Sequence, residues 1–399
     1  MLTKSMLLYF HKFNYAHFSP SQCVVVRPPK GCPHSSPKTL WRLKKTLYGL
    51  VRSLLHWFNH ISACFKSIGL SNSPNHPCVF YGSLLPDHPP IYVGLYVDDF
   101  CFFSISDKVE VQFRTLLNQH YTVSYEDSLD WFLGMKFEWS FTDTGLQVHV
   151  HQEAFVSELI SRHNLTGCNK SPRATPFKSG FPVDCIPPSN LSVTDQAQLT
   201  PPYQQLMGDL TWFSISTRSD VTAILSLLSE HTHSPSQAHL TYALHVVKYL
   251  ASTKSLGLLF SSDSQHQLHS FVQFKDASSD LQVLCDANWG PMDASRPKAE
   301  APPVEQSLQS LRSISGWLAL HSGAPIAWGC LRHKHTVQSS CEAEVHSINE
   351  ATKLILQLKL LFRDLALPIC TPIPLYNNNQ GAVHWSKGTT TKKMKWIDL

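Results

Sequence analysis

The sequence predicts an α+β protein in which helices and strands alternate, and three stretches favour this class. The run Ile91 to Phe103 is rich in Val, Tyr, Phe and Ile, which is typical of a pair of strands. Apolar residues recur at helical spacing from Ser53 to Ile68, and Gly69 follows as a helix end. A second apolar stripe, from Val345 to Leu365, predicts a long helix that stops before Pro368.

The remaining elements follow from the same periodicities. Helices are expected at residues 112–120, 151–163, 203–229 and 238–251. Strands are expected in the stretches WFLGMKFEWS, LQVLCDAN, ISGWLALHS, APIAWGC and PIPLYNNN. The chain is therefore predicted to mix helices and strands throughout.

Two proline-rich segments, at residues 168–203 and 290–310, separate the predicted helices and strands into groups. The first holds seven prolines, which we expect to prevent both a helix and a central strand. The segments divide the chain into a front, a middle and a back block. No repeat of 20 to 50 residues is visible, which argues against a solenoid or a propeller.

Composition places the chain among globular proteins. It has 399 residues, 43% of them hydrophobic, and no apolar run reaches the roughly 20 residues that span a bilayer. With no signal-peptide pattern, we expect a cytoplasmic or nuclear location and no membrane partner. The eleven cysteines include no CxxC pair, so we interpret them as reduced core residues rather than zinc ligands or disulfides.

Charge is segregated along the chain. Residues 1–86 contain ten Lys or Arg and no Asp or Glu, although the net charge of the whole chain is only +4. Basic residues interleaved with aromatic ones suit a phosphate backbone and stacked bases. A solvated basic face is the simpler interpretation of the charge bias alone.

Two adjacent acids, Asp98 and Asp99, lie inside the apolar run IYVGLYVDDFCFF. Like charges beside aromatic residues repel each other and lose hydration, so the pair is unfavourable without a counterion. At a tight turn both carboxylates can face one site, and Mg²⁺ prefers carboxylate oxygen. Taken alone, an ordinary acidic hairpin turn is the more common explanation of such a pair.

The flanking motifs resemble those of copia-type long-terminal-repeat retrotransposon Pol polyproteins, which contain a reverse transcriptase and an RNase H. The similarity runs from about residue 22 to the end of the chain. The matching stretches, in the family's order, are LWRLKKTLYGL, LYVDDF, WFLGMKF, YQQLMGDLTWFSISTRSDV, HLTYALHVVKYL, LCDANWG, SISGW, SSCEAEVHS, YNNNQGA and KKMKWIDL.

This resemblance implies RNA-directed DNA synthesis on an RNA template from a DNA primer. It assigns Asp98 and Asp99 to the palm, as catalytic ligands of Mg²⁺ in a two-metal site. Nucleic-acid contacts are expected from residues in or beside the first matched motif: Arg42, Lys44, Lys45, Arg52 and Trp57.

The back block resembles RNase H, which cleaves the RNA strand of an RNA–DNA hybrid with carboxylates and two metal ions. The matched catalytic and metal-binding acids are Asp286, Glu344 and Asp398, with Glu342 as a competitor for the helix position. A basic cluster suited to the hybrid's phosphates, or else a frayed terminus, is formed by Lys387, Lys392, Lys393 and Lys395.

Three positions depart from the family pattern. Asn378 stands where the third RNase H acid is expected, and an amide lacks the charge that holds a divalent ion. The acid-free first 25 residues lack the palm's first Asp. Leu54 and Leu55 replace a Pro and an Arg of the family. We therefore expect an N-terminally truncated copy with impaired chemistry.

The resemblance also implies an organisation. The expected parts are an unmatched remnant (1–25), an incomplete palm without fingers (26–167), a proline-rich linker (168–202), a helical thumb or connection (203–265) and an RNase H-like domain (266–399) with a mixed five-stranded sheet and an insertion at 290–310. An intact element would place the chain in a virus-like particle. The alternative function is a non-catalytic nucleic-acid-binding remnant. A generic metal-dependent nuclease does not explain the ordered polymerase motifs.

Three histidine pairs are spaced two residues apart: His149 with His151, His231 with His233, and His333 with His335. Such pairs can bind zinc. No third ligand lies at a suitable spacing, which favours structural or surface roles.

Overall fold

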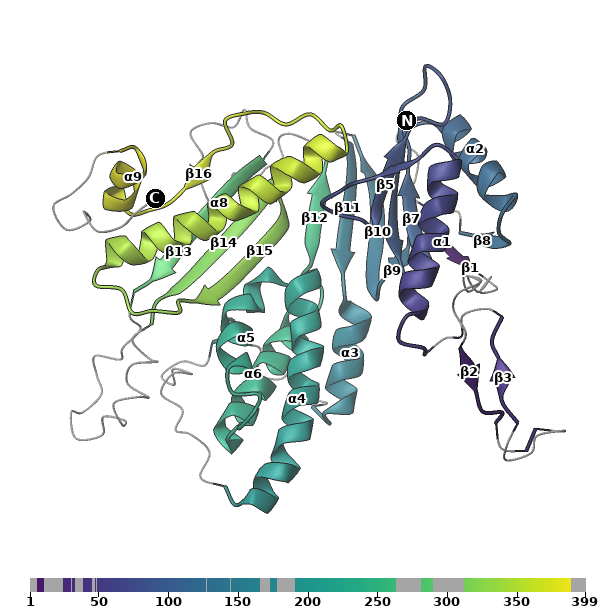
Figure 1. Cartoon of the computed structure of the whole chain (residues 1–399). Helices are drawn as coiled ribbons and strands as arrows, with labels where there is room; N and C mark the ends of the chain where they lie inside the picture. The colour runs from purple at the N-terminus through teal and green to yellow at the C-terminus, as the bar shows by residue number, and fades with distance from the viewer. Residues whose placement is uncertain are drawn as a thin grey trace, which may run out of the picture. The chain divides into compact units, whose positions relative to one another are not determined.

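The computed structural model describes residues 6–10, 24–29, 31–32, 39–44, 47, 49–126, 128–143, 145–165, 173–177, 191–262, 281–289 and 312–388. The chain forms two compact units, which are described separately (Figure 1). Unit 1 comprises residues 1–132 and 360–367, and unit 2 comprises residues 133–359 and 368–399. Helices and strands alternate in both, so the α+β class is confirmed.

Unit 1 is built on a six-stranded sheet with the order β4-β5-β6-β7-β1-β8. All of its pairs are antiparallel. The strands are β1 (Met6–Phe10), β4 (Ser71–Asn72), β5 (Val79–Gly82), β6 (Ile91–Tyr96), β7 (Asp99–Phe103) and β8 (Val123–Tyr125). A separate two-stranded ribbon pairs β2 (Val25–Val26) with β3 (Trp41–Arg42).

Two helices pack on the apolar residues of this sheet. The predicted first helix is confirmed as α1 (Ser53–Ser67), and Gly69 ends it with a φ of 101°. The second, α2 (Asp107–Asn118), begins earlier than the predicted residue 112. Asp107 and Glu110 occupy its first turn, where negative charge complements the helix dipole. Aromatic rings fill the core, with Phe65 edge-to-face on Phe80 at 4.9 Å between centroids.

The last strand of unit 1 is β9 (Trp131–Phe132). Unit 2 contains strands in the order β12-β11-β10, namely β10 (Met135–Thr142), β11 (Gly145–His151) and β12 (Leu258–Ser261). The stretch WFLGMKFEWS was predicted as one strand, but Leu133 and Gly134 have positive φ and divide it. The hairpin β10–β11 pairs over its full length, with Glu138 opposite His149.

A cluster of helices follows in unit 2. It comprises α3 (Glu153–Arg162), α4 (Val193–Ser216), the 3₁₀ turn η3 (Ser219–Val221), α5 (Thr222–Ser229) and α6 (Gln237–Ser252). Their apolar faces enclose one core, in which Tyr203, Leu210 and Phe213 are fully buried. The Tyr203 hydroxyl donates to the Leu228 carbonyl at 2.8 Å, which satisfies the polar end of this ring.

The proline-rich segment was predicted to be free of helix, and this prediction was wrong for its last part. Helix α4 begins at Val193 and includes Pro201 and Pro202. Ser192 caps the helix by accepting the Asp195 amide at 3.1 Å. Both prolines lack an amide hydrogen, and the helix continues because the buried face from Leu199 onward packs in the core.

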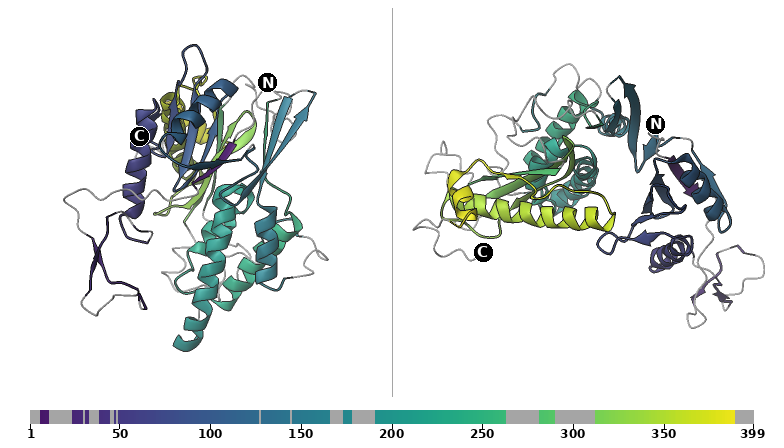
Figure 2. Two further views of the ribbon diagram at one scale, coloured as in Figure 1. Left: turned by 90° about the vertical axis from the view of Figure 1, so that its right-hand side faces the viewer. Right: turned by 90° about the horizontal axis from the view of Figure 1, so that it is seen from above.

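The back of unit 2 is a mixed sheet in the order β15-β14-β13-β16. Its strands are β13 (Leu281–Asn288), β14 (Ile314–His321), β15 (Ala324–Arg332) and β16 (Leu375–Tyr376), and β16 runs parallel to β13. Two helices follow β15 along the chain, α8 (Ser340–Asp364) and α9 (Gln380–Ser386). Helix α8 lies along one face of the sheet (Figure 2), where Val283 and Cys285 meet Ala351. The part of the chain described here supplies four strands, where five were predicted.

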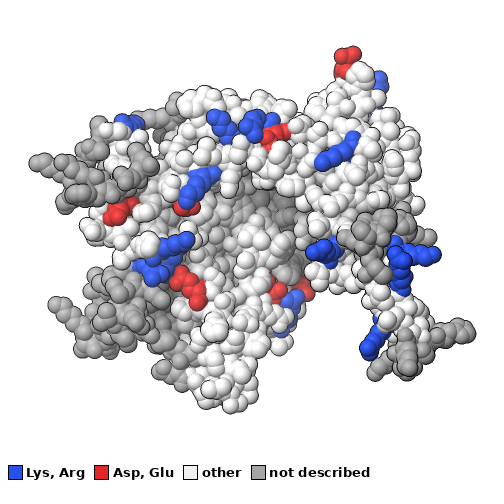
Figure 3. All heavy atoms as spheres, in the orientation of Figure 1, with Lys and Arg blue, Asp and Glu red and all other residues white. Residues whose placement is uncertain are grey.

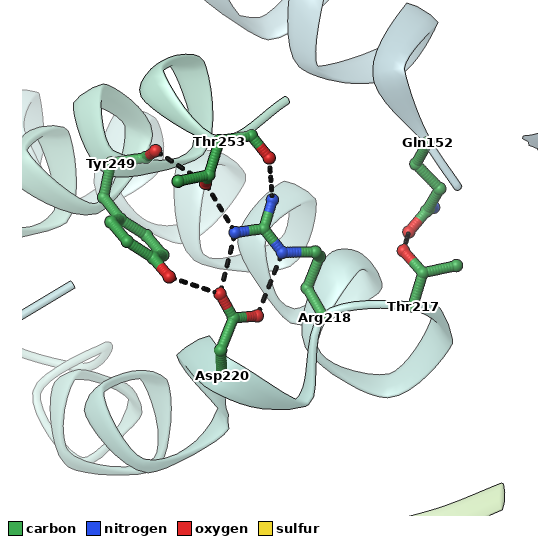
Figure 4. A network of polar contacts seen from close by, with 6 residues as sticks. All are labelled: Gln152, Thr217, Arg218, Asp220, Tyr249 and Thr253. Atoms are coloured by element: carbon green, nitrogen blue, oxygen red, sulfur yellow. Dashed lines mark hydrogen bonds and ion pairs between the residues drawn. The ribbon is translucent and has the colours of Figure 1, made fainter. Parts of the chain in front are cut away.

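A polar network around the buried Arg218 joins the helices of unit 2 (Figure 4). Arg218, only 2% exposed, donates from Nε and Nη2 to the two oxygens of Asp220 at 2.9 and 2.8 Å. It also donates to the carbonyl and hydroxyl of Thr253 at 3.0 and 2.7 Å. The Tyr249 hydroxyl donates to Asp220 at 2.6 Å. Burial opposes ionisation of Asp220, but the hydrogen bonds and charge of Arg218 outweigh it and hold the pKa of Asp220 below its ordinary value.

No helix within these described ranges combines the length and apolarity that a membrane span requires.

Arg218→Ala is expected to destabilise unit 2 by about 1–3 kcal/mol, because the buried guanidinium that donates to Asp220 and Thr253 is lost. Urea denaturation followed by circular dichroism measures this change. The double variant R218A/D220A serves as the control, since its destabilisation is expected to be smaller than the sum of the two single variants when the residues interact. A double variant as unstable as the sum of the two single variants contradicts this assignment.

Candidate functional sites

The first candidate site is the tip of the β6–β7 hairpin in unit 1. Tyr96 pairs with Asp99, so Val97 and Asp98 form a two-residue turn. Val97 adopts a φ of 55°, which is the left-handed conformation that tight hairpin turns require. The apolar side chains on either side are buried, including Leu95 and Phe100, while Tyr96 is 52% exposed. The strands therefore hold the adjacent acids at an accessible end of a rigid core.

Trp57 supports this turn from helix α1. Its indole Nε1 donates to the Val97 carbonyl at 2.6 Å, and the side chain is 5% exposed. The bond stabilises the one residue of the turn that is strained. In this position the ring presents almost no face to solvent, so the structure places Trp57 in the core rather than on a surface where a base can stack.

At the hairpin tip, no ion pair within the described residues balances the two acids. Burial, followed by the neighbouring charge of Asp98, raises the pKa of Asp99. No Lys or Arg forms an ion pair with either acid among the residues that the structure describes. The pair therefore has the donor chemistry of a divalent cation site, with two carboxylates and an unmet need for positive charge.

Strand β1 lies beside β7 in the same sheet. Tyr9 is opposite Asp99 in the antiparallel register, and Leu8 is opposite Phe100. The strand contains no acid, and neither does any other part of residues 1–86. The neighbouring strand is thus present at the hairpin, but it brings no third carboxylate.

The basic residues predicted to contact nucleic acid are exposed wherever the structure describes them. Arg42, Lys44 and Arg52 are exposed, whereas Lys45 lies outside the described residues. Around β2 and β3, the face shown in Figure 3 carries basic side chains with no acidic ones beside them. This local excess of positive charge agrees with the acid-free composition of the first 86 residues.

The second candidate site lies in unit 2, at the end of β13. Glu344, from α8, is 5% exposed, and the Asn377 side chain donates to it at 2.8 Å. Burial and then the charge of Asp286 raise the pKa of Glu344, against the opposing effect of the Asn377 hydrogen bond. Asp286 and Glu344 are therefore brought together from separate elements. The competing residue Glu342 instead accepts the Gln338 amide at 2.7 Å.

The three asparagines after β16 have different positions. Asn377 faces Glu344 and also donates to the Cys285 carbonyl at 3.2 Å. Asn379 caps α9 by accepting the Ala382 amide at 3.0 Å. Asn378 lines the same cavity as Asp286. Asp398, Lys392, Lys393 and Lys395 lie outside the described residues, and Lys387 is exposed.

This cavity has a volume of about 600 Å³ and lies between the sheet and the η3–α5 segment. Asp220, Asp286 and Asn378 supply polar groups, and Trp317 and Trp328 supply aromatic walls. The indole of Trp328 donates to the Ser214 carbonyl at 2.6 Å, which fixes that wall to α4. The sequence pattern did not identify Asn377 or the tryptophans, because their positions depend on how β16 pairs with β13.

Comparison with known proteins finds similarity to reverse transcriptases and to proteins of retrotransposons. Residues 12–179 match the family "Reverse transcriptase (RNA-dependent DNA polymerase)". The chain is 25% identical over 361 residues to the retrovirus-related Pol polyprotein from transposon RE1 of Arabidopsis thaliana. It is 27% identical over 331 residues to a transposon Ty5-1 protein of Saccharomyces cerevisiae, and 21% identical over 392 residues to the Pol polyprotein from transposon TNT 1-94 of Nicotiana tabacum.

These matches cover 90%, 82% and 97% of the chain, respectively. The chain spans 22% and 27% of the two plant polyproteins, and 93% of the yeast protein. Among solved structures, a foamy viral protease-reverse transcriptase in complex with dsDNA is similar at a TM-score of 0.45 and 14% identity, over 100% of this chain and 64% of that chain.

Trp57→Phe is expected to destabilise unit 1 by about 1–3 kcal/mol, because the Val97 carbonyl loses its donor and the core loses volume. Thermal and urea unfolding measure the change. Trp41→Phe is the matched control, since Trp41 is 42% exposed and its replacement is expected to change stability by less than about 0.5 kcal/mol. Equal effects of the two substitutions contradict a supporting role for Trp57.

Proposed function

We propose that this chain is built for RNA-directed DNA synthesis and retains an incomplete catalytic centre, because residues 12–179 match a reverse transcriptase family and the chain aligns with retrotransposon Pol polyproteins. The substrates are an RNA template and a DNA primer. The observation that carries the proposal is the β6–β7 hairpin, whose tip presents two adjacent carboxylates that pair with no Lys or Arg in the described part of the chain.

Asp98 and Asp99 are the residues that would hold Mg²⁺. A bound divalent ion supplies positive charge where phosphoryl transfer develops negative charge. The hairpin holds the two carboxylates in place, and Trp57 fixes the turn between the strands. Exposed Arg42, Lys44 and Arg52 supply positive charge for the nucleic-acid backbone.

Impairment follows from the acid-free strand β1. Two-metal phosphoryl transfer uses several carboxylates to hold both ions. Strand β1 is the neighbour of the acid-bearing strand β7, and it contributes none. The proposal is therefore weak polymerisation in this chain, limited by metal binding rather than by the fold.

The same proposal extends to the C-terminal region as an RNase H-like site for an RNA–DNA hybrid. The proximity of Asp286 and Glu344, and the Asn378 position beside them, support it. Asp398 is the further acid of this proposed site. The domain boundaries at residues 26–167, 203–265 and 266–399 remain part of the proposal.

Primer extension on an RNA template with Mg²⁺ tests the polymerase proposal. Extension by the wild-type chain is expected to be weak and to disappear in D98N/D99N. Tyr9→Asp and Phe10→Asp, tested singly, place an acid at two successive positions of β1, and Tyr9 is opposite Asp99 in the strand register. One of them is expected to raise extension about tenfold or more by supplying a third carboxylate, and the other is its control.

Efficient extension by the wild-type chain contradicts the impairment. Binding of primer and template without extension in any variant supports a non-catalytic nucleic-acid-binding protein instead.

Asn378→Asp is expected to raise hybrid cleavage about tenfold or more, because it adds a metal-binding charge beside Asp286. Release of labelled RNA from an RNA–DNA hybrid measures it. Asn377→Asp is the matched control, since it removes the donor to Glu344 and places a second charge against that acid. Cleavage that rises equally in both variants, or in neither, counts against the proposed position of the third acid.

A further inference from the structure

A second kind of metal-ligand cluster lies on the β10–β11 hairpin of unit 2, separate from the acids discussed above. Glu138 on β10 pairs directly with His149 on β11, and His151 follows on the same face two residues later. We propose that Glu138, His149 and His151 form a zinc site. The proposal does not depend on polymerase or nuclease activity.

The ligand atoms are already close to the spacing that zinc requires. Nε2 of His151 lies 3.5 Å from Oε1 of Glu138, and Nδ1 of His149 lies 3.9 Å from Oε2. All three ligand atoms fall within 4.8 Å of one another. Ligands 2.0–2.1 Å from a tetrahedral zinc ion are about 3.3 Å apart, so only small side-chain rotations are needed.

The surroundings hold the two rings in this arrangement. The imidazoles stack at 4.9 Å between centroids, and His151 is 5% exposed. Gly257 packs against β11, where a side chain would meet the Val150 carbonyl at 2.2 Å and Nε2 of His149 at 3.0 Å. This close approach favours Nδ1 of His149 as the ligand atom, because it faces Glu138 instead.

The donor set selects zinc over magnesium. Two imidazoles and one carboxylate, with a fourth position open, are a ligand set of zinc sites that keep a bound water. Mg²⁺ prefers oxygen ligands.

Two contacts compete with the metal. The Lys136 ammonium lies 2.5 Å from Oε1 of Glu138 and forms an ion pair with the carboxylate that zinc would bind. The Glu153 amide donates to Nδ1 of His151 at 3.3 Å. Zinc at Nε2 moves the imidazole proton to Nδ1, and this long hydrogen bond is then lost. Removing Lys136 is therefore expected to strengthen binding, an outcome that a purely structural ion pair does not produce.

Competition with a chromogenic zinc chelator tests the proposal on the reduced full-length chain. The wild-type protein is expected to bind one zinc ion more than the triple variant E138Q/H149N/H151N. Each single substitution is expected to weaken that site about tenfold or more, and Lys136→Met is expected to tighten it. Glu138 is 48% exposed in its side chain, so Glu138→Gln tests ligation with little risk to folding.

His231→Asn is the matched control. His231 stacks on His239 at 4.0 Å, yet no carboxylate or thiol completes a three-ligand group there in the described part of the chain. Equal zinc stoichiometry and affinity in the wild type and the triple variant overturn the proposal. So does Mg²⁺ that displaces zinc from the site at comparable concentration.

Discussion

Strand register is the constraint on which every candidate site in this protein depends. Hydrogen bonds between strands fix which residues lie opposite each other, and side chains that are far apart in sequence meet only through that pairing. The pairing of Tyr96 with Asp99 leaves a two-residue turn and places both acids at its end. The pairing of Glu138 with His149 brings together the ligands of the proposed zinc site. The parallel pairing of β16 with β13 sets the asparagines beside Asp286. A slip of one residue in any of these pairs would turn the functional side chains to the opposite face.

Much of the fold follows from local patterns, and the exceptions have physical causes. Helix α1 and the strands around Asp98 were predicted because periodicity and β-branched composition are properties of adjacent residues. Helix α4 was missed at its start because two prolines outweigh local helix propensity, whereas the structure gains more from burying Leu199 and Tyr203 in the helical core. Leu133 and Gly134 interrupt a strand through positive φ, which the apolar pattern does not report.

The residues of a candidate site were predictable from the sequence only where they belong to a recognisable sequence motif. Asp98 and Asp99 are adjacent in sequence, and Asp286 and Glu344 belong to motifs that matched a family in order. Glu138 and Asn377 were missed for the opposite reason, because each acts through a partner on another element. The histidine pair at 149 and 151 lacked a third ligand by sequence spacing alone. The missing ligand comes from the opposite strand, at a separation that only the register determines.

Electrostatic environment distinguishes the proposed site acids from structural ones. The side chain of Asp220 is 34% exposed, and its pKa is lowered because the buried Arg218 supplies a permanent counterion within the fold. Burial raises the pKa of Glu110 on α2 to about 7, although nearby Arg114 acts in the opposite direction. Asp99 and Glu344 differ from both, because a neighbouring carboxylate raises the pKa of each and, among the described residues, no Lys or Arg lowers it. A fold retains such a pair at a cost in stability unless a bound cation offsets the repulsion. Glu138 differs from Asp99 and Glu344, because the ammonium of Lys136 already balances its charge and lowers its pKa. Zinc binding at Glu138 therefore requires that zinc displace Lys136 from the carboxylate.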